Sequence, residues 1–238
     1  MAKLVWDDVG EHLYETGVDH GVLYTLDDDK AYKNAEVWNG LTSITASPSG
    51  AEETKLWADN INYASLRSME SYGGTIEAYT YPDTFAECDG TAELVTGAYI
   101  GQQPRAVFGL AYRTLVGNEV DLNDHGYKIH LIWGCTCSPS QKTYSTVNDS
   151  PEAITFSWEF TTTPVPVTGY KPTSEMVIDS TECDDEALAA LEAQLFGVDA
   201  VEADLANDVD AVEEVDPWLP TPDVVIAILN GTWEPEEP

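Results

Sequence analysis

Strict alternation of apolar and polar side chains constrains the fold of this chain more than any other feature. Between residues 154 and 163 the apolar set is Ile154, Phe156, Trp158 and Phe160, with Thr, Ser and Glu between them. A period of two residues places the two sets on opposite faces of a β-strand. Residues 127–133 and 105–115 follow the same pattern, so we expect three strands that each bury one face.

Shorter β-forming stretches surround these three strands. The Asn- and Gly-rich loop at residues 117–126 is expected to join two of them as an antiparallel hairpin, and one short helix is expected at residues 84–88. Weaker strands are expected at residues 21–26, 37–46, 54–57, 61–66, 75–81, 142–146 and 175–179. This pattern of strands and turns favours a mainly β fold, an antiparallel sandwich or barrel with a short flanking helix and a small acidic helical appendage.

The strand faces that point away from the expected core carry few charges. Free-standing sheets usually present Lys and Glu there, because charge protects exposed faces and edges from pairing with other chains. The corresponding residues here are Thr42, Thr45, Thr75, Thr155, Ser157 and Thr161. We therefore expect other subunits to cover part of these faces, with a monomer that has a threonine-rich surface as the alternative.

The net charge excludes several classes of function. The formal net charge is −33 over 238 residues, and all ten Lys and Arg residues precede Pro172. Residues 172–238 contain nineteen Asp and Glu and carry −19, whereas the first 171 residues carry −14. Such a chain repels nucleic acid, anionic membranes and acidic ligands.

Three parts are expected along the chain: an N-terminal arm at residues 1–18, a β domain at residues 19–180, and an acidic, partly helical extension at residues 181–238. No apolar run is long enough for a transmembrane helix, and the first residues lack the pattern of a signal peptide. The spacing of the four cysteines is not that of a disulfide framework, so we expect reduced thiols made in a cytosol.

Two helices are expected in the acidic extension. Thr181 is the expected cap of the first, three leucines follow at helical spacing, and Gly197 ends it. The second is expected at residues 224–229. The extension is too thin to fold alone, so we expect it to dock on the β domain or on a partner, or else to stay mobile.

The residues that most suggest a metal site are His125, His130, Cys135 and Cys137. On one extended strand His130 is expected to point away from both cysteines, and His125 to lie about 33 Å from them. Zinc needs every ligand within about 2.3 Å, so no metal site is expected. The acidic residues 27–29 lack the Gly and Glu of a calcium loop, and no catalytic or cofactor-binding motif is found, so we expect no enzyme activity and no cofactor.

A series of short motifs over about residues 5–180 resembles one protein family. These motifs are VWNGLTSI at residues 37–44, SPSGAEET at 47–54, LWADN at 56–60, YGGTIE at 72–77, YPD at 81–83, CDG at 88–90 and RAVFGLAYR at 105–113. In order and spacing they resemble the major tail proteins, or tail tube proteins, of long-tailed phages that infect mainly Gram-positive bacteria. The segment LPTPDVVIA at residues 219–227 is similar to the C-terminal extension of some members.

The resemblance implies a structural virion protein rather than an enzyme. In this family six β-sandwich subunits form a ring, their inner sheets join into a barrel around a lumen, and stacked rings form the tube for genome ejection. The implied partners are further copies of the chain and the tape measure, tail terminator and distal tail proteins. DNA passes through without specific binding, no membrane is contacted, and the tail is assembled in the host cytoplasm.

The resemblance also assigns residues to the assembly. Residues 46–59 correspond to a long loop that contacts the neighbouring ring, and the candidates there are Ser47, Pro48, Ser49, Gly50, Glu52 and Glu53. The arm at residues 1–18 is expected to bridge subunits. Residues 37–46 and 75–81 are the candidate lumen strands, with Glu77, Thr42 and Thr75 facing the lumen. Because a conduit must not hold DNA, we expect the lumen to be negative.

Two other functions are compatible with this composition. An acidic DNA mimic would occupy a basic site on a DNA-binding host protein, but it should place carboxylates regularly along one surface, whereas the acids here are densest in the extension. A β-sandwich module that binds carbohydrate or calcium on a cell surface is the third possibility, and the absent export signal argues against it.

Overall fold

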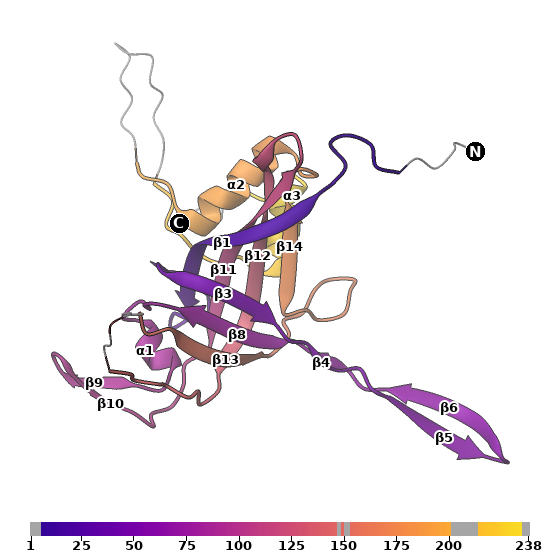
Figure 1. Ribbon diagram of the computed structural model, residues 1–238, viewed down its shortest axis with the longest axis horizontal. Helices are drawn as coiled ribbons and strands as arrows, with labels where there is room; N and C mark the ends of the chain where they lie inside the picture. The colour runs from indigo at the N-terminus through magenta and orange to yellow at the C-terminus, as the bar shows by residue number, and fades with distance from the viewer. Residues whose placement is uncertain (1–5, 147–148, 150–152, 201–213, 235–238) are drawn as a thin grey trace, which may run out of the picture.

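The computed structural model describes residues 6–146, 149, 153–200 and 214–234 (Figure 1). The chain is mainly β, with 46% strand and 11% helix, which confirms the fold class expected from the alternating segments. The main sheet of the described chain has the order β2-β1-β11-β12-β13-β8-β3, and β14 also pairs with β12. Its strands are β1 (Tyr14–Thr25), β2 (Asn34–Val37), β3 (Leu41–Ala46), β8 (Gly73–Ala78), β11 (Phe108–Asn118), β12 (Leu122–Cys137), β13 (Phe156–Thr162) and β14 (Glu175–Asp179).

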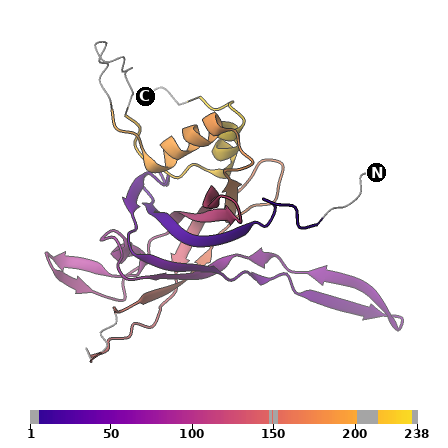
Figure 2. The same ribbon diagram turned by 45° about the horizontal axis from the view of Figure 1, so that its top comes forward.

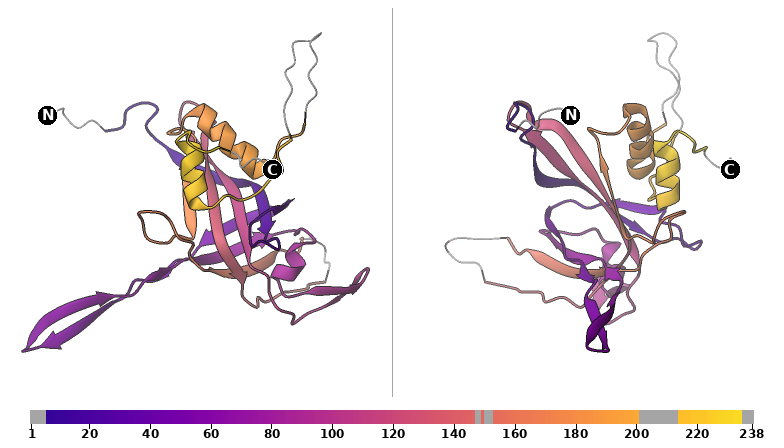
Figure 3. Two further views of the ribbon diagram at one scale, coloured as in Figure 1. Left: turned by 180° about the vertical axis from the view of Figure 1, so that it is seen from behind. Right: turned by 90° about the vertical axis from the view of Figure 1, so that its right-hand side faces the viewer.

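The long strand β12 belongs to two layers of the molecule. Residues 128–132 pair with β14, and residues 135–137 pair with β13. Between these two segments Gly134 has a φ of +67°, and a Cβ atom there would lie 2.2 Å from the carbonyl oxygen of Thr163. Glycine thus permits the close approach, and β13, β8 and β3 lie across the longer strands as a second layer (Figure 3).

The inner core lies between these two layers and is rich in aromatic rings. Phe108 and Leu110 of β11 join one buried cluster with Ile76 of β8 and Trp158 of β13. Phe85 adds a ring whose centroid lies 5.1 Å from that of Trp158. It belongs to the short helix α1 (Phe85–Cys88), which forms where the sequence predicts a helix.

Two helices cover the outer face of the longer strands, α2 (Asp185–Phe196) and α3 (Pro222–Leu229) (Figure 2). The three leucines at helical spacing are buried in α2, in a second core that includes Trp133 of β12. The hydroxyl of Tyr24 donates a hydrogen bond of 2.6 Å to the Leu195 carbonyl, and the Trp133 indole donates one of 2.9 Å to the Pro220 carbonyl. The described part of the acidic extension therefore docks on the β domain.

The start of α2 differs from the expectation. Its cap is Asp184, whose carboxylate accepts hydrogen bonds from the backbone N–H groups of Glu186 and Ala187. Thr181 instead donates its hydroxyl to Asp179, because the chain is still leaving β14 at that point. Gly197 ends the helix as predicted. No helix of the described chain is long and apolar enough to span a membrane.

Three predictions about the strands are wrong. Residues 142–146 form no strand, because they lack an apolar face and Lys142 turns to pair with Asp89. The strand expected at residues 37–46 is divided into β2 and β3 by a turn at Gly40, where φ is +80°. The strand β1 begins at Tyr14, inside the segment expected to form an arm.

The substitution Leu191→Ala should lower the free energy of unfolding by about 2–5 kcal/mol, because it removes a fully buried side chain from the outer core. Urea denaturation followed by circular dichroism measures the change. The matched control is Leu66→Ala, at a side chain that is 56% exposed, where the expected change is below about 0.5 kcal/mol. Equal losses at the two positions would contradict the docking of α2.

Candidate assembly surface

A long two-stranded hairpin projects from the body between β3 and β8 (Figure 1). The backbone N–H of Ser47 donates to the Gly73 carbonyl at its base. Beyond that point β4 (Ser49–Gly50) pairs with β7 (Glu70–Ser71), and β5 (Glu53–Ala58) pairs with β6 (Ile61–Arg67). At about 3.3 Å per residue, residues 46–59 span at most about 43 Å. No other part of the described chain pairs with this hairpin.

The hairpin exposes large apolar side chains to solvent. Leu56, Trp57 and Tyr63 are 43%, 69% and 71% exposed, and further exposed residues are Ile61, Leu66 and Met69. Its two faces differ, because the cross-strand pairs of Leu56 with Ala64 and of Thr54 with Leu66 alternate with charged or polar pairs. An isolated two-stranded ribbon is only marginally stable in water, so this surface has the character of one completed by a partner.

The candidate inter-ring residues all lie in the first half of this hairpin. Ser47 and Pro48 connect β3 to β4, Ser49 and Gly50 form β4, and Glu52 and Glu53 lead into β5; all six residues are exposed. The resemblance placed the boundary at residue 59 and left out the returning strand. Asp59 and Asn60 have φ values of +51° and +65°, as in a two-residue hairpin turn. An Asp-Asn dipeptide between two apolar stretches is the sequence feature that could have predicted this turn.

The layer of β3, β8 and β13 has a polar outer face. Glu77 and Thr75 alternate on β8 with the buried Ile76, and Glu77 accepts a hydrogen bond of 2.8 Å from the Ser43 hydroxyl. Register places Ser157 opposite Glu77 and Glu159 opposite Thr75. These three strands contain two Glu and no Lys or Arg. The structure thus brings two of the three candidate lumen residues onto one acidic face.

The third candidate, Thr42, lies elsewhere. A register shift between Leu41 and Ser43 leaves Thr42 without a partner on β8, and it lines a groove of about 450 Å³ between β3 and the strands β1, β11 and β12. The outer edge of β3 pairs with no other strand of the described chain. Its sequence, LTSITA, contains neither the charge nor the proline that usually protects an edge.

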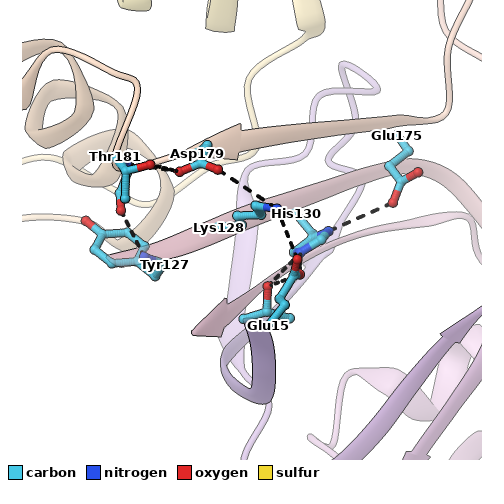
Figure 4. Close-up of polar contacts among 9 residues, drawn as sticks. Glu15, Tyr127, Lys128, His130, Glu175, Asp179 and Thr181 are labelled. Carbon is cyan, nitrogen blue, oxygen red and sulfur yellow. Dashed lines mark hydrogen bonds and ion pairs between the residues drawn. The ribbon is translucent and has the colours of Figure 1, made fainter. Parts of the chain in front are cut away.

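The same groove contains a network of charged side chains around His130 (Figure 4). The imidazole stacks on the Tyr112 ring with centroids 4.6 Å apart. Its Nε2 atom lies 3.6 Å from Glu15, and its Nδ1 atom lies 4.0 Å from Glu175 and makes no hydrogen bond. Lys128 connects Glu15 to β14 through ion pairs of 3.0 Å with Glu15 and 3.9 Å with Asp179.

These neighbours favour ionised carboxylates in the groove. The Thr114 hydroxyl, followed by Lys128, holds the pKa of Glu15 below its usual value despite partial burial. The His130 imidazole and the Tyr72 hydroxyl do the same for the pKa of Glu175. The groove therefore links β1, β12 and β14 by electrostatic interactions, and within it the Thr114 hydroxyl lies 3.0 Å from Nε2 of His130.

The expected direction of His130 is wrong. It stacks on Tyr112, which belongs to the inner core together with Cys135 and Cys137, so it lies on the same side of β12 as the cysteines. The irregular register around Gly134 shifts the alternation by one residue. Nevertheless, among the described residues no group of three or more His, Cys, Asp or Glu is arranged to hold a metal ion.

Comparison of the sequence with protein-family models and with curated proteins finds no match. The exposed surfaces of the molecule are therefore the guide to its function. Their distinctive combination is an uncovered amphipathic hairpin, an unprotected sheet edge and an acidic face that joins the two. These features have the chemistry of contacts between protein chains.

The substitution Glu175→Gln should reduce stability at neutral pH and have little effect near pH 3. A carboxyl group whose pKa is lower in the folded state adds stability above its unfolded pKa of about 4.3, and this contribution is lost as the pH falls through the folded value. Thermal unfolding at several pH values measures the difference from wild type. Glu159→Gln, at an exposed carboxylate, is the control, and a difference that grows towards acid pH would contradict the assignment.

Proposed function

We propose that this protein is a structural subunit that polymerises as stacked rings, with six copies in each by analogy with the family it resembles, into the tail tube of a long-tailed phage. The observation that carries the proposal is the exposed hairpin built from β4, β5, β6 and β7, which continues directly from the unprotected edge strand β3. Both features are costly in a protein that stays monomeric, and both become favourable when copies of the chain associate.

The hairpin supplies hydrophobic contact area for association. Complete burial of a large apolar side chain contributes about 1.5–3 kcal/mol, and Leu56, Trp57 and Tyr63 each retain much of their surface to bury. The edge of β3 supplies unpaired backbone N–H and C=O groups that another strand can satisfy. Together these contacts can overcome the repulsion between chains that each carry a formal charge of −33.

The acidic outer face of β3, β8 and β13 suits the wall of a DNA conduit. Each contact of a Lys or Arg with phosphate would add affinity through counterion release and hold the genome in place. Glu77 and Glu159 repel phosphate instead, and their repulsion is screened beyond about 8 Å at physiological salt. In this arrangement α2 and α3, on the opposite side of the molecule, belong to the exterior of the tube.

The double substitution Leu56→Asp with Leu66→Asp should prevent assembly without unfolding the subunit. The aspartates place two charges on the apolar face of a hairpin that contributes nothing to either core. Negative-stain electron microscopy should show rings or tubes for the wild type and dispersed subunits for the variant. Circular dichroism should show the same secondary structure in both.

The matched control places the same charges at another exposed loop, with Val120→Asp and Leu122→Asp at the turn between β11 and β12. This variant should assemble as the wild type does. The proposal is wrong if the wild type forms neither rings nor tubes over a range of salt and protein concentrations. A discrete 1:1 complex with a DNA-binding protein would favour the DNA mimic, and binding of a sugar or of calcium would favour the surface module.

Assembly should become more favourable as salt or divalent cations are added, because each subunit carries a formal charge of −33 and the copies repel one another. Light scattering by the purified protein measures the effect between low salt and about 0.5 M NaCl, with circular dichroism to verify that the subunit stays folded. Scattering that falls as salt rises would show that attraction between unlike charges dominates the contact.

A further inference from the structure

A second exposed hairpin lies at the other end of the molecule. It is formed by β9 (Ala92–Val95) and β10 (Ala98–Ile100), which pair only with each other within the described chain. This hairpin and the β5–β6 hairpin lie at opposite ends of the longest axis in Figure 1, and the views in Figures 2 and 3 agree. The two are therefore too far apart to meet within one chain.

The β9–β10 hairpin also presents apolar side chains without a covering element. Leu94, Val95 and Tyr99 are each more than half exposed. The one charged residue of its strands, Glu93, lies opposite Tyr99. The charge of Glu93, ahead of desolvation and of Asp83, raises the pKa of the Tyr99 hydroxyl.

The two hairpins differ in charge. The β5–β6 hairpin carries two bases, Lys55 and Arg67, and two acids, Glu53 and Asp59, so it is neutral overall. Arg67 approaches Glu53 only to 4.0 Å, and Lys55 forms no ion pair with the described residues. Residues 82–104, which include the β9–β10 hairpin, contain four acidic residues and no Lys, Arg or His, although one of the four, Asp89, pairs with Lys142. An apolar surface with a free cation thus lies at one end, and an apolar surface with Glu93 and no base lies at the other.

We propose that the β5–β6 hairpin of one copy packs on the β9–β10 hairpin of the next copy. This inference rests on the proposed function and identifies the surface against which the projecting hairpin packs. The contact is heterologous, because it joins two different surfaces. Heterologous contacts continue from copy to copy unless their rotation closes a ring, so they can extend a stack, whereas a contact of either hairpin with itself would stop at a dimer.

The size of the contact determines whether it can hold two free subunits together. Strand β5 has six residues, so one face of the ribbon covers roughly 20 Å by 10 Å, or about 200 Å². Stable protein pairs bury about 800 Å² per partner. One hairpin contact is therefore too small to hold two free subunits, and it becomes effective only when a ring presents several such contacts at once.

Cross-linking between introduced cysteines tests the pairing. The background is Cys183→Ser, because the other three cysteines are buried. The full-length protein receives Leu56→Cys, Leu94→Cys, or both, and assembled particles are treated with a short bismaleimide. The double variant should give a ladder of covalent multimers on denaturing gels, whereas a mixture of the two single variants should stop at dimers and each single variant should give none.

The control cysteine is Val120→Cys, at an exposed position outside both hairpins, combined with Leu56→Cys. It should give at least tenfold less cross-linked product than the Leu56–Leu94 combination. If tubes form but Leu56 cross-links to itself or to position 120 instead, the pairing is wrong while the proposed function survives. If no rings or tubes form under any condition, the proposed function and the pairing fail together.

Discussion

Burial of both faces of β11 and β12 is the constraint on which the rest of the structure depends. Their alternating side chains supply Phe108 and Leu110 to the inner core, and Leu131 and Trp133 to the outer one. A strand buried on one side needs a single covering layer, but these strands need two. The second sheet layer satisfies one face and the helices α2 and α3 satisfy the other.

This constraint changes the meaning of the acidic extension. Its charge suggests a solvated tail, yet α2 places three leucines against the sheet, keeps Asp184, Asp185 and Glu186 exposed at its start, and directs Glu192 to the Tyr127 hydroxyl. Removal of residues 181–238 would uncover Trp133 and Tyr24, so truncation would expose a core rather than trim a surface. The high negative charge of this segment and its structural role are therefore compatible, because only four of the nineteen acidic residues at positions 172–238 lie in α2 and α3.

The sequence was most informative where one face of an element is buried. The alternation around Trp158 and the strand at residues 175–179 are found as predicted, as are the leucines of α2. Errors arose where tertiary contacts override a local pattern. The bend at Gly134 reverses the side on which His130 lies, and the turn at Gly40 divides one expected strand in two. The register shift before Ser43 likewise separates Thr42 from Glu77, and neither composition nor periodicity reports such shifts.

An unprotected edge and a high net charge act over different distances, and this difference allows both to exist in one chain. Backbone pairing along β3 requires strands about 4.8 Å apart, whereas repulsion between the chains extends over about 8 Å at physiological salt. Repulsion therefore opposes random encounters between edges before any hydrogen bond can form. Only an approach that buries apolar hairpin surface at the same time can overcome it, so in the proposed assembly the negative charge makes association selective rather than impossible.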